Sequence, residues 1–173
     1  MQFLDHTYIW DWCRTHGFSL EESEPINGVR LEEDASLIHR DRLVHDAADD
    51  SVAALLLAGD VRRVLGDWDD CLAWVTDSDV WVNEEDWPEH YRWRGEHGER
   101  RSLDSTPGHL FTVDDESDFM ILASHAIKCG WDVTFLPAKG EVSTGVRVRC
   151  SHDEWIDVRS RESIAISAPE QPG

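Results

Sequence analysis

Three short strand-forming segments close the sequence, and they set the strongest limit on its fold. They span residues 131–136, 145–150 and 155–159, and turn-forming residues separate them. Strands joined by short turns pair with their neighbours in the sequence, so this region predicts an antiparallel meander. A strongly helical segment over 115–129 precedes it, with acids in its first turn and Gly130 after its end.

The upstream chain alternates helical patterns with single strands. The Asn27-Gly28 pair is a turn signal and indicates a short hairpin. Residues 36–45 fit either two strands around Arg40-Asp41 or a loop. Gly59-Asp60 could split the helical pattern over 47–65 into two helices. We expect helices over 5–16, 47–65 and 87–97, and strands over 71–76 and 110–113.

This order of elements predicts an α+β fold, a mixed α/β sandwich. Its helices would pack on a small sheet that ends in the C-terminal antiparallel meander. The length fits one compact globular domain over residues 1–166, within which 1–46 could form an N-terminal subdomain. Residues 167–173 are expected to form a loose tail.

The charge balance is strongly acidic, with 36 acidic against 16 basic residues and a net charge of −20. Direct binding of nucleic acid and of anionic membranes is therefore not expected, because both need clustered Lys and Arg. A basic protein surface would be attracted, and a homo-oligomer is compatible with the sequence. A salt-adapted host is the alternative source of the acidity, in which case the charge indicates no partner.

The cysteines and the N-terminus favour a cytoplasmic protein without cofactors. Cys13, Cys71, Cys129 and Cys150 form no C-x-x-C pair and lie among apolar residues, so we expect four free, buried thiols. No signal-peptide pattern is present, and the longest apolar run, over 52–58, is too short to span a bilayer.

A stretch rich in Trp and acid over residues 67–93 is the candidate partner-binding region. Cys71 to Thr76 reads as a buried strand with Trp74 in the core, together with Trp12 and Trp131 elsewhere. The acid-flanked part after it combines aromatic anchors with carboxylates, a combination that suits a partner bearing Arg and Lys. The predicted binding residues are Asp77, Asp79, Trp81, Glu84, Glu85, Trp87 and Trp93.

Catalytic signatures are weak, so the sequence favours a non-enzymatic protein. There is no H-E-x-x-H, G-x-S-x-G or phosphate-binding glycine motif, and the paired carboxylates sit mostly at predicted helix starts. No metal site is predicted. Nine histidines keep open a small hydrolase or metal-dependent enzyme in which scattered His and carboxylates converge.

One basic feature stands against the acidic background. Arg147 and Arg149 alternate with valines, and Arg159 and Arg161 follow on the next predicted strand, so they should project from the sheet. A solvated face paired with the protein's own acids is the favoured interpretation, and a small anion site is the other. The leading functional hypothesis is an acidic soluble interaction protein that binds and inhibits or neutralises a basic protein, as an immunity protein or a nucleic-acid mimic does.

Overall fold

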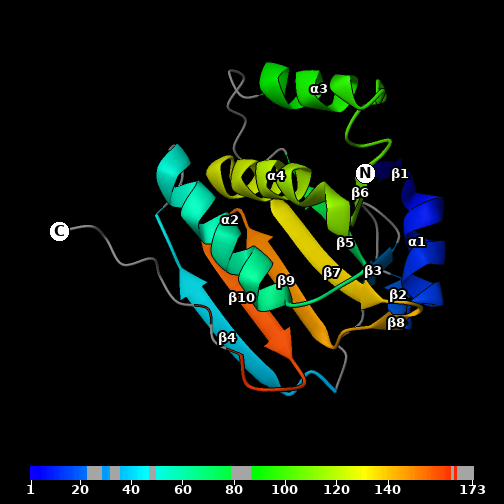
Figure 1. Ribbon diagram of the computed structural model, residues 1–173, viewed down its shortest axis with the longest axis vertical. Helices are drawn as coiled ribbons and strands as arrows, with labels where there is room; N and C mark the ends of the chain where they lie inside the picture. The colour runs from blue at the N-terminus through cyan, green and yellow to red at the C-terminus, as the bar shows by residue number, and fades with distance from the viewer. Residues whose placement is uncertain (23–28, 32–35, 47–49, 79–86, 165, 167–173) are drawn as a thin grey trace.

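One large antiparallel sheet organises the computed structural model, which describes residues 1–22, 29–31, 36–46, 50–78, 87–164 and 166 (Figure 1). Seven strands follow the order β1-β6-β5-β7-β9-β10-β4, and β8 pairs with β7 as the eighth strand. Their bounds are β1 Gln2–Leu4, β4 His39–Val44, β5 Asp70–Asp77, β6 Gly108–Thr112, β7 Asp132–Lys139, β8 Val142–Ser143, β9 Val146–Ser151 and β10 Trp155–Ser160. A separate two-stranded sheet joins β2 (Leu20–Glu22) to β3 (Val29–Leu31).

The first two helices begin at residues whose side chains satisfy free backbone amides. Asp5 accepts a hydrogen bond from the amide of Tyr8 at the start of the first helix, and Asp50 accepts from Val52 and Ala53 at the start of the second. The helices are α1 His6–Thr15, α2 Ser51–Leu65, α3 Trp87–Glu96 and α4 Glu116–Lys128, with a 3-10 turn over Val113–Asp115 before α4. None of the described helices is long and apolar enough to cross a membrane.

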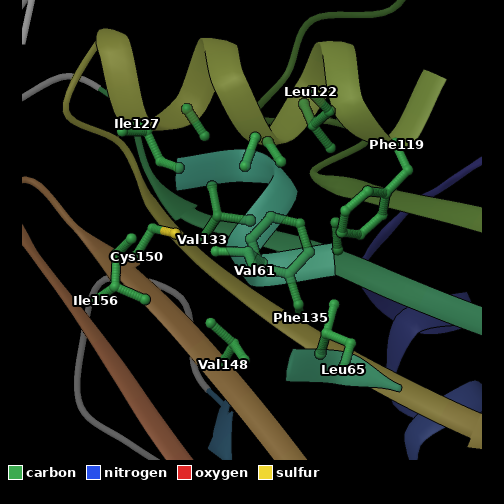
Figure 2. Close-up of a cluster of buried hydrophobic side chains, with 14 of the residues drawn as sticks. Val61, Leu65, Phe119, Leu122, Ile127, Val133, Phe135, Val148, Cys150 and Ile156 are labelled. Atoms are coloured by element: carbon green, nitrogen blue, oxygen red, sulfur yellow. The ribbon is translucent and has the colours of Figure 1, made fainter. Parts of the chain in front are cut away.

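The main core lies between one face of the sheet and the pair α2 and α4, which cross that face side by side (Figure 1). Figure 2 shows Val61 and Leu65 of α2 and Phe119 of α4 directed toward Phe135 and Val148 of the sheet. Alternate residues of β7, β9 and β10 point into this core because successive side chains of a strand face opposite sides. We call this side the helix-covered face.

The other face of the sheet is only partly covered. Helix α1 packs over its β5 and β7 part, where Ile9 and Trp12 bury Leu72 and Trp74. Gly108 of β6 lies under the same helix, and a Cβ at this position would come within 2.7 Å of the Ile9 side chain. The remaining part, over β9, β10 and β4, carries no helix in the described residues, and we call it the open face.

The α+β class and the C-terminal meander are confirmed, but the expectation of a small sheet is corrected to eight strands. Residues 36–45 contain the single strand β4, and α2 runs unbroken through Gly59.

The expected turn at Pro137 begins only at Gly140, because β7 continues to Lys139. The pairing of β9 with β7 ends at Phe135, and beyond it the Pro137 carbonyl accepts a hydrogen bond from the Thr144 amide. A proline can make this bond because its carbonyl is the acceptor.

The early hairpin is confirmed in its pairing, since β2 and β3 are antiparallel with Leu20 opposite Leu31. Its Asn27-Gly28 turn lies outside the described residues. All four cysteines are free and buried, as expected.

Candidate functional site

Six charged side chains form a regular array on the open face, contributed two by each of three neighbouring strands. The register places Arg147 of β9 opposite Arg159 of β10, which lies opposite Arg40 of β4. The next row on the same face joins Arg149, Asp157 and Arg42 in the same strand order. We call these six residues the arginine grid.

The spacing of the sheet fixes the size of the grid. Neighbouring strands lie about 4.8 Å apart, and residues i and i+2 of one strand lie about 6.6 Å apart. The backbone positions of the grid therefore span roughly 10 Å by 7 Å. Like charges directly opposite each other on adjacent strands are destabilising, so the row of three arginines costs stability unless anions offset it.

Asp157 is the anion at the centre of the grid, and its side chain is 7% exposed. It accepts hydrogen bonds from the Nε atoms of Arg40 at 2.5 Å, Arg159 at 3.2 Å and Arg42 at 3.4 Å. Burial alone would raise the pKa of this carboxyl, but the bonds from Arg40 and Arg159 hold its pKa below the ordinary value. Asp157 is therefore ionised at neutral pH.

Trp155 and Asp132 make additional contacts with Arg42 and Arg149. The guanidinium carbons of Arg42 and Arg149 lie 4.1 Å and 5.4 Å from the centre of the Trp155 ring, in cation–π range. Arg149 also donates to Asp132 at 2.7 Å, and Asp132 contacts the His152 ring at 2.9 Å. Each of these contacts restricts a long side chain, so the array is partly organised before any ligand arrives.

The grid lines a groove of about 610 Å³ that extends across the sheet from β4 to β5. Trp74, Thr76 and Thr134 line its β5 and β7 end, and Glu21 also lines the groove. Among the described lining residues, five arginines face two carboxylates, those of Asp157 and Glu21. The volume is typical of small-molecule sites.

The guanidinium forks leave capacity for an anion. Arg40 and Arg42 reach Asp157 through Nε, and within the described part of the chain no hydrogen bond engages their terminal nitrogens. Their side chains are 49% and 41% exposed, so these nitrogens are open to solvent and to a ligand. Planar guanidinium groups match carboxylate and phosphate oxygens in pairs, which makes the groove chemically suited to anions.

The partner-binding residues predicted from the sequence lie mostly elsewhere or outside the described residues. Asp77 is exposed at the end of β5, and Trp87 begins α3, while Trp93 is buried at 7% exposure and donates its indole N–H to Asp118 at 2.9 Å. Trp93 stacks on His109, so its ring is part of the core and not of a display surface. Asp79, Trp81, Glu84 and Glu85 lie outside the described residues.

A histidine cluster fills the space between α3, α4 and β6. The His90 ring lies 5.3 Å from His125 and 6.1 Å from His109, measured between ring centres. Burial, together with smaller effects of the nearby His109, His125 and Arg94, lowers the pKa of His90 to about 2. Burial and the nearby Arg94 lower the pKa of His109 to about 3, so both rings are neutral.

The cluster brings histidines and carboxylates together, since His90 and His125 line a pocket of about 350 Å³ with Glu89 and Glu96. A further carboxylate nearby, Asp118, contacts His97 at 3.0 Å. Among the residues that the structure describes, no group of three or more His, Cys, Asp and Glu side chains is arranged to hold a metal ion.

Three of the six grid residues were identified from the sequence. The alternation of Arg147 and Arg149 and the position of Arg159 were visible, whereas Arg40, Arg42 and Asp157 were not assigned to the same surface. Arg161 lies beyond β10 and bonds Ser36 instead of joining the grid. The missed signal is the same alternation of arginines in His39–Val44, but its pairing with β10 joins residues more than a hundred positions apart.

Comparison of the chain with models of known families, with curated proteins and with solved structures gives no match in any of the three. Function is therefore inferred from the geometry and charge of the site.

Proposed function

We propose that this chain is a non-catalytic binding protein whose arginine groove takes up an anionic ligand. The observation that carries the proposal is the arginine grid, in which five arginines on three adjacent strands surround one buried carboxylate. An anion bound there would offset the repulsion between neighbouring guanidinium groups and form charge-assisted hydrogen bonds.

The acidic balance of the whole chain does not oppose this proposal. At about 0.1 M salt, exposed charges more than about 10 Å apart are largely screened from one another. The grid spans a similar distance, so a ligand seated on it meets mainly the groove charges. Distant acids slow the approach of an anion more than they weaken its bound state.

The state of the reactive groups supports binding over catalysis. Burial raises the pKa of Cys13 and Cys150 to about 12, so both thiols are protonated and unreactive. His90 and His109 are neutral and packed among aromatic rings. In the described part of the chain, the groove itself holds arginine, threonine, tryptophan and carboxylate side chains, which suit recognition.

The test is anion-dependent stabilisation. Sulfate should raise the melting temperature of the protein at constant ionic strength, and the rise should shrink strongly in Arg40→Gln/Arg42→Gln. Arg92→Gln is the matched control, because Arg92 is an exposed arginine of α3 outside the groove. Equal responses of both variants and the unaltered protein would reject the groove as an anion site.

A second candidate function remains the binding of a basic protein partner, as an inhibitor or neutraliser. It is favoured by the net charge of −20 and by the exposed Asp77, which leads into the acid-rich segment 79–86. With five arginines gathered in one groove, the acids elsewhere face few bases. Complementary charge would accelerate association with such a partner.

This second proposal requires the acid-rich segment. Glu84→Lys/Glu85→Lys should abolish a complex with a purified basic partner without lowering the melting temperature, and Trp81→Ala should weaken it. If the complex forms with unchanged affinity in the charge-reversed variant, the acidic segment is not the binding surface.

A further inference from the structure

We infer that the ligand of the arginine groove is a compact polyphosphate carried on a small organic molecule. This inference rests on the proposed function of the groove and names its ligand class. It follows from three properties of the groove: the size of the grid, its charge density and the space beside it that Trp74, Thr76 and Thr134 line.

The size of the grid favours a short ligand with several charges close together. Its backbone positions cover roughly 10 Å by 7 Å, as strand spacing dictates. A terminal phosphate group carries about −1.5 to −2 charges on three strong acceptor oxygens at neutral pH. Each inner phosphate of a chain adds a further single charge. A chain of two or three phosphates therefore places its whole charge within reach of Arg40, Arg147 and Arg159.

An acidic peptide matches this grid less well. In an extended chain, side chains on one face repeat about every 6.6 Å, so at most two carboxylates fall within the grid. The remaining acids would lie over neighbouring surface, where Glu21 and Asp132 already place negative charge. A nucleic-acid strand has the same disadvantage, because its backbone continues across an acidic protein.

The β5 and β7 end of the groove explains the organic component. Trp74, Thr76 and Thr134 line it, and among the described residues the groove carries no arginine beyond those of the grid. The 610 Å³ volume accommodates more than a bare phosphate chain. Trp155 is already covered by guanidinium groups, so the organic part is expected to lie toward Thr134 and not on the Trp155 ring.

The experiment is calorimetric titration of the full-length protein in metal-free buffer at low salt. The probes are inorganic triphosphate, adenosine triphosphate, citrate, a glutamate-rich peptide and a short oligothymidylate. We expect inorganic triphosphate to bind at least tenfold more tightly than citrate or the peptide, and adenosine triphosphate to bind at least as tightly as triphosphate. Oligothymidylate should bind more weakly than either.

The outcomes separate the inference from the proposal on which it rests. Citrate or peptide binding as tight as triphosphate would overturn the polyphosphate while leaving an anion groove in place. Adenosine triphosphate binding much more weakly than triphosphate would overturn the organic component, and tighter oligothymidylate binding would replace the small ligand with a nucleic acid. No binding by any probe would remove the groove as an anion site altogether.

Variants locate the binding. Arg40→Gln and Arg147→Gln should each weaken triphosphate about tenfold, the effect of one lost charge-assisted hydrogen bond. Arg92→Gln should leave the affinity unchanged, and circular dichroism should show that each variant is folded. If a groove variant does not fold, Arg40→Lys, which keeps the charge but loses the fork, should weaken binding while preserving the fold. Affinity that stays constant in all groove variants would overturn the assignment.

Discussion

At the scale of single residues, Asp157 sets the balance between stability and binding. Its carboxylate offsets three surrounding guanidinium groups, and it also occupies Nε atoms that a ligand could use. The two roles oppose each other. A residue that serves stability alone would affect unfolding and leave anion affinity unchanged.

Asp157→Asn should therefore lower stability and raise anion affinity together. We expect a loss of about 1–3 kcal/mol in the free energy of unfolding, toward the lower end because Arg40 and Arg42 are nearly half exposed. Urea denaturation and sulfate titration measure the two effects. Asp104→Asn, at an exposed loop position, is the control and should change neither. A stability loss with no gain in anion affinity would leave Asp157 a structural residue only.

Glu99 provides a pH prediction in a part of the molecule away from the groove. The Arg101 side chain donates hydrogen bonds to Glu99, and these outweigh burial and lower the Glu99 pKa from 4.5 to about 2. A carboxylate whose pKa is lowered by folding stabilises the folded state fully above its unfolded pKa, and this contribution is lost as the pH falls. The loss should occur between about pH 4.5 and pH 2.

The measurement compares the unaltered protein with Glu99→Gln by urea denaturation across that pH range. The unaltered protein should be the more stable of the two at pH 6, and the difference should shrink as the pH falls from 4.5 toward 2. A difference that stays constant with pH would show that the ionised form of Glu99 contributes nothing to stability.

At the scale of elements, the contact of α1 with β6 decides how much of the sheet is covered. Gly108→Ala would place a Cβ 2.7 Å and 2.9 Å from two side-chain carbons of Ile9, and 3.0 Å from the Leu4 Cβ. Relieving this overlap must shift α1, so we expect a loss of about 1–3 kcal/mol. Gly95→Ala in α3 has nothing within 4 Å and should be neutral or stabilising by up to about 1 kcal/mol. Equal melting temperatures for the two variants would show that α1 does not pack closely on β6.

Elements with local signals could be predicted from the sequence, and those set by distant pairing could not. Asp5 and Asp50 cap their helices, and alternating valines mark β9, since both signals are short-range. The pairing of β4 with β10 joins residues that are far apart in the sequence. Alternation of side chains along one strand does not indicate which other strand it pairs with, or in which register. Arg40, Arg42 and Asp157 could therefore not be assigned to the same surface as the other grid residues from the sequence alone.

Burial of aromatic residues was the other point that sequence pattern left open. Trp93 lies beside acids in the sequence and was predicted as a binding residue, but its side chain lies in the main core. In α3, Glu89 and Glu96 are exposed although their spacing places them on the same helix face as the buried Trp93. Flanking acids therefore do not report the direction of a helical side chain.

At the scale of the whole molecule, charge is divided between surfaces. The chain carries a net charge of −20, yet five of its arginines lie in one groove on the open face. The helix-covered face is closed by α2 and α4, which leaves the opposite side of the sheet for a ligand (Figure 1). This division allows one acidic molecule to hold an anion in its groove and to attract a basic protein elsewhere.

The central claim is that the arginine grid binds an anion, and side-chain NMR of the arginine Nε–H groups tests it most directly. During titration with inorganic triphosphate, the Nε signals of Arg40, Arg42 and Arg159 should shift together with one affinity, because ligand contact changes their bonds to Asp157. The Nε signals of Arg63 and Arg92, which lie on α2 and α3, should stay in place. Shifts of similar size at all arginines, or none within the grid, would contradict the account.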